Sequence, residues 1–237
     1  MIRVAVVGAS GRMGSTVCDA LRGDPDTELV AAVDVGDDLG AILDAGADVA
    51  VEFTVPDSVK RNVSWLLEHG VHTVVGATGL SDADLADIGA LTGPANCFVA
   101  PNFAIGAVLA IQLAQRAARW LPHVEIIESH HDGKVDAPSG TALRAAALIA
   151  EGRQDEVSPP GPRDHAARGM AVEGIPIHSV RLPGLVAHHE FVLGGQGQTL
   201  TIRHDSLDRS SFMPGVLLAV KRVASLPGLT VGLEALL

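Results

Sequence analysis

The chain has 237 residues, of which 47% are hydrophobic and only 3% are aromatic. This length suits one large domain or two small ones, and the hydrophobic content excludes a disordered or collagen-like chain. The formal net charge of −11 provides no basic surface for phosphate backbones, so we expect no nucleic acid partner. We also expect a cytoplasmic protein with no membrane partner, because no apolar run reaches about 20 residues and no secretion signal is evident.

Strands and helices are predicted to alternate over the first hundred residues. Short β-rich runs occupy residues 3–7, 29–33, 48–54, 71–75 and 96–100. Segments with apolar residues at helical spacing occupy residues 14–22, 56–70 and 82–91. The alternation predicts an α/β fold with a Rossmann-type, doubly wound parallel sheet.

The regular alternation of predicted strands and helices ends after residue 103. Helices are predicted at 104–120, 141–151 and 212–224, strands at 124–129, 177–181, 188–193 and 198–204, and a short tail at 229–237. Residues 151–173 contain prolines and several charges, and they predict a long loop of the kind that often forms a lid. We therefore predict a dinucleotide-binding domain at 1–103 plus 213–237, and a second α+β domain with a mixed sheet at 104–212.

Three glycines follow the first predicted strand. Gly8, Gly11 and Gly14 lie in the sequence GASGRMG, a variant of the dinucleotide fingerprint. In that fingerprint the glycines permit a tight turn and let a pyrophosphate approach a helix N-terminus. Asp34 lies 20 residues after Gly14, where a carboxylate can accept hydrogen bonds from an adenosine ribose. Two alternatives stay open: the glycine turn binds no ligand, or Asp34 is only an acidic residue of the turn that ends the strand.

Asp34 also bears on the choice of cofactor. A carboxylate at this position favours NADH, because it repels the 2′-phosphate of NADPH. Arg12 in the glycine loop could offset part of that repulsion, so NADH and NADPH both stay open.

Two later turns fit the same ligand. Residues 76–79 follow the fourth predicted strand, and residues 100–103 follow the fifth. Ligands of open parallel sheets bind outside the carboxyl ends of the strands. We therefore expect both turns beside the nicotinamide, the alternative being ordinary connections between strand and helix.

Residues 128–142, ESHHDGKVDAPSGTA, combine several groups that suit acid chemistry on an anion. His130 and His131 are adjacent, so in an extended segment their side chains point to opposite sides. Lys134 adds a positive charge, and Ser139 is a predicted N-cap whose helix would offer free N–H groups to a carboxylate. Each residue also has an ordinary structural role open to it. Together with a dinucleotide loop, however, they predict hydride reduction of a conjugated double bond with a histidine as proton donor.

This segment resembles the signature of the dihydrodipicolinate reductase family, also called 4-hydroxy-tetrahydrodipicolinate reductases, of lysine and diaminopimelate biosynthesis. Four further segments are similar to that family, and their sequences resemble those of its actinobacterial members: VAVVGASGRMG, VVGATG, APNFAIGAV and RHDSLDRSSFMPGVLLAV. The resemblance implies NADH- or NADPH-dependent reduction of 4-hydroxy-tetrahydrodipicolinate to tetrahydrodipicolinate. It also implies a homotetramer assembled through the sheet of the second domain, and a hinge between the domains.

The resemblance also assigns site residues. His130 would be the proton donor or acceptor and Lys134 a second proton donor, as the catalytic pair. The substrate contacts would be His131, Ser139, Gly140 and Thr141. The cofactor contacts would be Gly8, Ala9, Ser10, Gly11, Arg12, Met13, Asp34, Gly76, Ala77, Thr78, Ala100, Pro101, Asn102 and Phe103.

The chain departs from its relatives at a few positions. Ser10 and Arg12 stand where similar members often have lysines, which leaves the ratio of NADH to NADPH use open. Asp132 and Gly133 lie in a variable part of the signature and add a negative charge, which we expect to modulate activity. Arg209 could bind a substrate carboxylate or cap a hinge.

Three other functions fit parts of the sequence. A metal hydrolase would use His130, His131 and Asp136, with His188 and His189 as a second pair, but none of these has the spacing that presents two ligands on one helical face. A regulator would bind the dinucleotide without turnover. A thiohemiacetal dehydrogenase would use Cys97, which however lies in an apolar strand pattern typical of a core. We predict no metal ligand.

Overall fold

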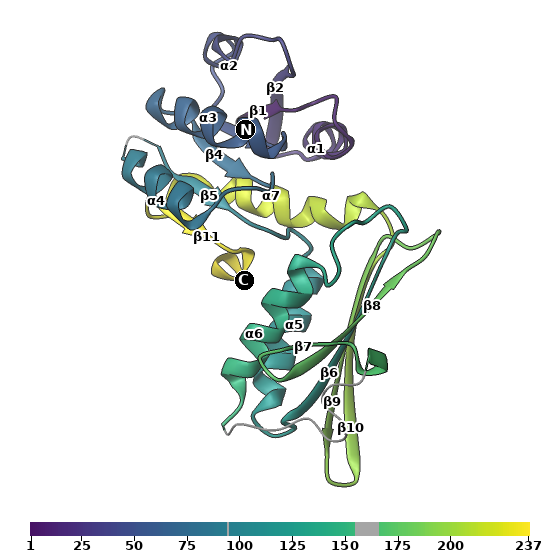
Figure 1. Ribbon diagram of the computed structural model, residues 1–237. Coiled ribbons are helices and arrows are strands. Elements are labelled where there is room, and N and C mark those ends of the chain that lie inside the picture. The colour runs from purple at the N-terminus through teal and green to yellow at the C-terminus, as the bar shows by residue number, and fades with distance from the viewer. Residues whose placement is uncertain (94, 155–165) are drawn as a thin grey trace. The chain divides into compact units, whose positions relative to one another are not determined.

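The protein is described by a computed structural model that covers residues 1–93, 95–154 and 166–237. Contacts divide it into two compact units (Figure 1). Unit 1 comprises Met1–Ile105 and Arg209–Leu237, and unit 2 comprises Gly106–Asp208. Within the described ranges, no helix has both the length and the apolar character needed to cross a membrane.

Unit 1 is built on a six-stranded sheet in the order β11-β5-β4-β3-β1-β2, with every pair of neighbours parallel. The strands are β1 (Ile2–Val7), β2 (Thr27–Val33), β3 (Val49–Glu52), β4 (His72–Val75), β5 (Cys97–Val99) and β11 (Leu229–Val231). The helices are α1 (Arg12–Gly23), α2 (Gly40–Asp44), α3 (Pro56–Glu68), α4 (Asp82–Leu91) and α7 (Met213–Arg222). The predicted Rossmann-type sheet is confirmed.

Helices cover both faces of this sheet. α1 contacts α7, and α3 contacts α4. Right-handed crossovers that run in opposite directions from β1 place α1 and α3 on opposite faces, and the contacts place α7 with α1 and α4 with α3. The four central strands are consequently buried on both sides, as the fully buried run from Val49 to Glu52 shows.

The register of the parallel strands aligns their carboxyl ends. Val7 pairs with Glu52, Glu52 with Val75, and Val75 with Val99. The turns after β1, β3, β4 and β5 therefore begin along one edge of the sheet. This is the edge at which open parallel sheets bind ligands.

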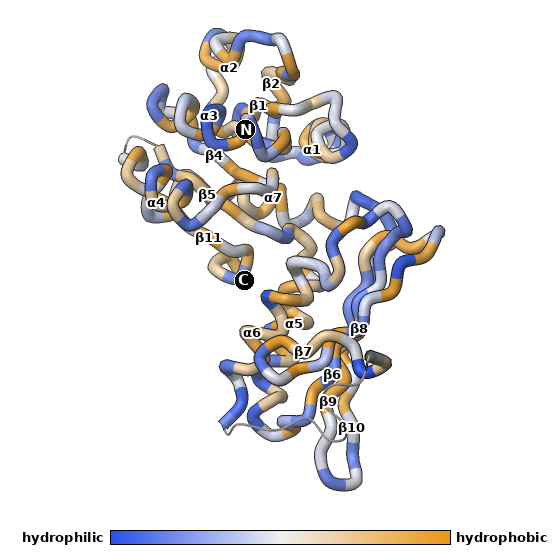
Figure 2. The backbone as a smooth tube through the Cα atoms, in the orientation of Figure 1, coloured by the Kyte–Doolittle hydropathy of each residue, from blue (hydrophilic) through white to orange (hydrophobic). Residues whose placement is uncertain are grey.

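Unit 2 contains a five-stranded mixed sheet in the order β10-β9-β6-β8-β7, in which only β6 and β8 are parallel. Its elements are α5 (Ile105–Ala118), β6 (His123–His130), α6 (Gly140–Gly152), β7 (Met170–Val172), β8 (Ile175–Arg181), β9 (Ala187–Gly195) and β10 (Gln198–Ser206). Helices α5 and α6 pack on one face and enclose a core of alanine, isoleucine, valine, leucine and phenylalanine. Figure 2 shows both helices as mainly hydrophobic and the β9–β10 turn as hydrophilic.

Two predictions about secondary structure were wrong. The segment at 229–237 is not only a tail, because β11 pairs with β5 and covers the edge of the first sheet. The segment at 151–173 includes β7, which forms a hairpin with β8 through Glu173 and Gly174, both at positive φ. Strands of three residues are too short to show periodicity. Residues 155–165, the centre of the predicted lid, lie outside the described residues.

Glu52 is a carboxylate at the end of a strand that is buried on both faces, and its side chain is fully buried. It accepts hydrogen bonds from the Thr54 hydroxyl and from Asn62 Nδ2 at 3.3 Å. Burial raises the pKa of Glu52, and these hydrogen bonds lower it by less. The ionised form is therefore disfavoured in the folded state.

We predict that Glu52→Gln changes how stability depends on pH. Because the folded-state pKa of Glu52 lies above its unfolded value, the stability from this group is complete below the unfolded pKa. It is lost as the pH rises through the folded pKa. The free energy of unfolding, measured with urea from pH 4 to pH 8, should rise in the variant relative to the wild type as the pH rises. Glu68→Gln, at an exposed position on α3, is the control, and parallel curves for all three proteins would contradict the prediction.

Candidate active site

The glycine turn of unit 1 is held tightly between β1 and α1. Gly8 has a φ of +83°, and a Cβ there would lie 2.8 Å from the Phe53 carbonyl oxygen. A Cβ at Gly14 would lie only 2.0 Å from the carbonyl oxygen of Gly8. Gly11 is the N-cap of α1 and has no side chain to occupy the first N–H groups of the helix. The turn can therefore present free backbone donors to a pyrophosphate.

Asp34 holds the glycine turn against the end of β2. Its Oδ2 accepts a hydrogen bond from the Ser10 backbone N–H at 2.6 Å and another from the Ser10 hydroxyl, and Oδ1 accepts from the Val35 N–H. The hydrogen bonds from Ser10 are the main reason that the pKa of Asp34 lies below its ordinary value. The carboxylate is thus ionised at neutral pH beside the turn.

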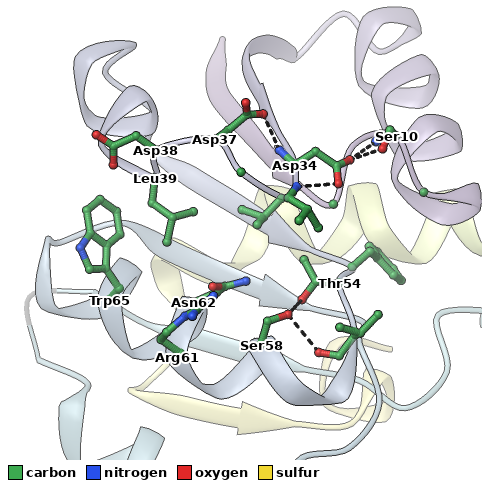
Figure 3. A pocket seen from close by; sticks show the side chains of 17 residues that line it. Ser10, Asp34, Asp37, Asp38, Leu39, Thr54, Ser58, Arg61, Asn62 and Trp65 are labelled. Carbon is green, nitrogen blue, oxygen red and sulfur yellow. Dashed lines mark hydrogen bonds between the residues drawn. The ribbon is translucent and has the colours of Figure 1, made fainter.

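A pocket of about 650 Å³ opens where β1, β2 and β3 end (Figure 3). Its volume is within the range of ligand pockets. The pocket is lined by Val7, Gly8, Ser10, Gly11, Asp34, Val35, Gly36, Asp37, Asp38, Leu39, Phe53, Thr54, Val55, Ser58, Arg61, Asn62 and Trp65. It therefore joins the glycine turn, the loop after β2 and one side of α3.

Four of the predicted cofactor residues line this pocket, namely Gly8, Ser10, Gly11 and Asp34. The turns at 76–78 and 100–103 follow the next two strands along the same edge of the sheet. Phe103 is buried and packs against Phe53, with ring centroids 5.9 Å apart. Asn102 accepts a hydrogen bond from the Ala104 N–H at 2.9 Å. The contacts predicted for these turns remain predictions.

Sequence reasoning missed the wall of the pocket that α3 supplies. Ser58, Arg61, Asn62 and Trp65 follow one another at helical spacing and face the loop after β2 in Figure 3. The spacing of three and four residues was the available signal. It did not stand out because the same helix buries its apolar residues against the sheet.

The second group of predicted residues lies at the end of β6 in unit 2. Alternate residues of this strand face inward, first Val124 and Ile126 in the core, then Glu128 and His130. A strand that presents apolar residues and then two ionisable ones on its buried face must satisfy those polar groups with partners. His131 lies just past the strand and is exposed.

Glu128 is fully buried and serves as the common acceptor of this site. Its carboxylate accepts two hydrogen bonds from Arg181, at 2.8 and 2.9 Å, in the bidentate arrangement that suits a guanidinium. It also accepts from His130 Nδ1 at 2.5 Å and from the Ser139 N–H at 3.2 Å. Burial raises the pKa of Glu128, but hydrogen bonds from Arg181, Ser179 and His130 outweigh burial and lower it. Glu128 is therefore a carboxylate in the folded protein.

His130 is nearly as buried as Glu128. Burial is the main cause that lowers the pKa of His130, with further lowering by Lys134 and Arg181, whereas Glu128 raises it. Its ring contacts that of His189 edge to face, with centroids 5.4 Å apart. Burial lowers the pKa of His189 to about 4, so His189 is neutral at neutral pH. Because the His130 ring is desolvated, its neutral form is favoured over the imidazolium ion.

The segment in which an anion site was predicted contains the N-terminus of α6. Ser139 is the N-cap, as predicted, and its hydroxyl accepts a hydrogen bond from the Ala142 N–H at 3.2 Å. Gly140 and Thr141 are the first two residues of the helix, so their N–H groups have no partner within it. The Gly140 N–H donates instead to the Asp136 carboxylate and helps to lower the pKa of Asp136. Lys134 forms an ion pair with Asp136 at 2.7 Å in the preceding loop. One segment therefore holds an imidazole, an ammonium group and helix N–H donors.

The competing functions find less support in the side chains. Within the described residues, no group of three or more histidine, cysteine, aspartate or glutamate side chains could hold a metal ion. Cys97 is fully buried, and burial raises its pKa to about 12. A thiol of that kind is a poor nucleophile.

Family comparisons cover almost the whole chain. Residues 2–103 match the family described as "Dihydrodipicolinate reductase, N-terminus", and residues 106–237 match "Dihydrodipicolinate reductase, C-terminus". The curated 4-hydroxy-tetrahydrodipicolinate reductase of Streptomyces coelicolor is 52% identical over 98% of this chain and 96% of its own length. That of Mycobacterium sp. strain KMS is 50% identical over 100% of this chain and 99% of its own.

Solved structures of similar fold include a member of the same family. The dipicolinate-bound dihydrodipicolinate reductase of Paenisporosarcina sp. TG-14 is 41% identical, with a TM-score of 0.88 over 100% of both chains. A probable dehydrogenase of Thermotoga maritima, at 13% identity and a TM-score of 0.64, shares the fold over 99% of this chain and 92% of its own. The chain therefore belongs to the dihydrodipicolinate reductase family, the NAD(P)H-dependent oxidoreductases of lysine and diaminopimelate biosynthesis.

Proposed function

We propose that this chain reduces 4-hydroxy-tetrahydrodipicolinate to tetrahydrodipicolinate, with His130 as the general acid. The observation that carries the proposal is the position of Glu128, which contacts both His130 and Ser139, the N-cap of α6. A proton donor and a group of anion-binding N–H donors are therefore attached to the same carboxylate. A small dicarboxylate needs both when it is reduced.

The chemistry assigns a task to each group. The glycine turn, Asp34 and the turns after β4 and β5 in unit 1 would hold NADH or NADPH, which would supply the hydride. The 4-hydroxyl group of the substrate leaves as water to give a conjugated double bond. Hydride addition to that bond leaves negative charge on the substrate, and a proton from His130 Nε2 neutralises it. The N–H groups of Gly140 and Thr141 would bind one carboxylate.

Lys134 and His131 complete the proposed substrate site. The ammonium group of Lys134 lies 2.7 Å from Asp136, so it is held within the loop that leads to α6. From there it would bind a second carboxylate or deliver a proton. His131 is exposed and can turn toward a bound substrate.

We further propose that the protein is a cytoplasmic homotetramer assembled through the sheet of unit 2. In support, α5 and α6 cover one face of this sheet, and most of edge strand β10 is exposed in the single chain.

A coupled assay tests the proposed reaction directly. The condensation product of pyruvate and aspartate semialdehyde is supplied, and the oxidation of NADH and of NADPH is followed separately. We expect oxidation of both, faster with NADH because ionised Asp34 lies beside the pocket. Absence of oxidation of either cofactor would refute the proposed function.

His130→Gln tests the general acid in the same assay. We expect kcat to fall by about 100-fold or more, with a smaller change in KM, because a general acid acts on the transition state. His123→Gln changes an exposed histidine at the start of the same strand and should leave kcat unchanged. An unchanged kcat in the His130 variant would remove His130 from its proposed role.

A further inference from the structure

The buried carboxylate of Glu128 joins three parts of unit 2 that are far apart in the sequence. It contacts His130 on its own strand, Arg181 on β8 and Ser139 at the start of α6. We propose that Glu128, clamped by Arg181, is a positioning residue that fixes the tautomer of His130 and leaves Nε2 as the nitrogen that delivers the proton. This proposal rests on the general-acid role proposed above for His130.

The tautomer follows from the chemistry of the two groups. A carboxylate can only accept hydrogen bonds, so the 2.5 Å contact requires the proton to be on His130 Nδ1. Neutral imidazole carries one N–H, and imidazolium carries two. With Nδ1–H committed to Glu128 in both states, only Nε2 gains and loses a proton during turnover. The same arrangement, in which a carboxylate orients a functional histidine, also makes its other nitrogen more basic.

Arg181 keeps Glu128 in the state that this role needs. A fully buried carboxylate without a positive partner would tend to take up a proton, and a protonated carboxyl could donate to Nδ1 and reverse the tautomer. The bidentate contact with Arg181 prevents this. Arg181 is itself held by the carbonyl oxygens of Val180 and Asp136. Its position therefore does not depend on Glu128 alone.

The charged groups around His130 have opposite effects on its protonation. Lys134 in the following loop and Arg181 on β8 disfavour the imidazolium ion, whereas Glu128 on β6 favours it. His189 on β9 is neutral and contributes a ring contact. Glu128 is thus the group, among these, that sustains a proton on a desolvated imidazole. Its loss should make His130 harder to protonate.

Glu128 also sets the distance between the imidazole and the anion site. One carboxylate oxygen accepts from the Ser139 N–H and the other from His130 Nδ1. The N-cap of α6 and the ring are therefore placed by the same group. A substrate carboxylate bound at the helix N-terminus would be presented to Nε2 at a fixed distance.

Glu128→Gln in the full-length protein tests the proposal. The amide keeps the shape of the side chain, loses the charge and can donate a hydrogen bond to Nδ1. We expect kcat to fall roughly 10- to 100-fold, the usual scale for loss of a residue that orients a functional histidine, with less change in KM. The high-pH limb of the kcat profile should move to lower pH, because His130 must be protonated to act and its pKa falls.

Nitrogen-15 NMR of histidine-labelled protein supplies a readout that a purely structural role would not move. The His130 signals, assigned by their absence in His130→Gln, should report Nδ1–H in the wild type and a population of Nε2–H in Glu128→Gln. Glu125→Gln is the matched control. Glu125 also contacts an arginine and a histidine, Arg168 and His178, but on the opposite face of β6, so the control should change neither the tautomer nor the pH limb.

A second variant keeps the test decisive if Glu128→Gln fails to fold. Glu128→Gln combined with Arg181→Met removes both members of the pair, so no buried charge is left without a partner. It should show the same fall in kcat and the same change of tautomer. A wild-type tautomer and pH limb in either folded variant would overturn the positioning role, even if His130→Gln abolishes turnover. An unchanged kcat in His130→Gln would instead remove the general-acid role on which the proposal rests.

Discussion

The ion pair between the buried Glu128 and the partly buried Arg181 is the interaction on which the proposed substrate site in unit 2 depends. Taking two charges out of water is unfavourable unless the geometry is good and the remaining polar atoms are satisfied. Here the contact is bidentate, and the carboxylate also accepts from His130 and Ser139. Removing one member of such a pair typically costs about 3 to 5 kcal/mol, because the other charge is left buried. The pair is therefore expected to persist through turnover.

In unit 1 the register of the parallel strands brings the ligand-binding edge of the sheet together. Because β1, β3, β4 and β5 end together, the glycine turn and the turns after the next strands share one edge. Ionised Asp34 then holds Ser10 of the glycine turn in place. Under the proposed function, the two units would therefore have separate tasks, with the cofactor bound in unit 1 and the substrate in unit 2.

Much of the fold and part of the site could be predicted from the sequence, because both depend on local patterns. The alternation of strands and helices identified the parallel sheet, and Ser139 was recognisable as an N-cap from its place before a helical segment. Strands β7 and β11 have three residues each and carry no periodicity of their own. Their pairing is decided by the neighbouring strands.

The partners of the predicted residues could not be found in the same way. Arg181 lies 53 residues from Glu128, and only the parallel pairing of β6 with β8 brings them together. Ser10 and Asp34 are likewise joined by the sheet. One signal was available: Glu128 shares the inward face of β6 with Val124 and Ile126, and a charge on a buried face needs a partner.

A crystal structure with pyridine-2,6-dicarboxylate bound would test the central claim most directly, namely that Glu128 places the proton donor and the anion site together. The account predicts one carboxylate of the ligand on the N–H groups of Gly140 and Thr141. It also predicts His130 Nδ1 on Glu128, with Nε2 facing the ligand ring. A ligand bound away from the α6 N-terminus, or a His130 ring turned so that Nε2 contacts Glu128, would contradict it.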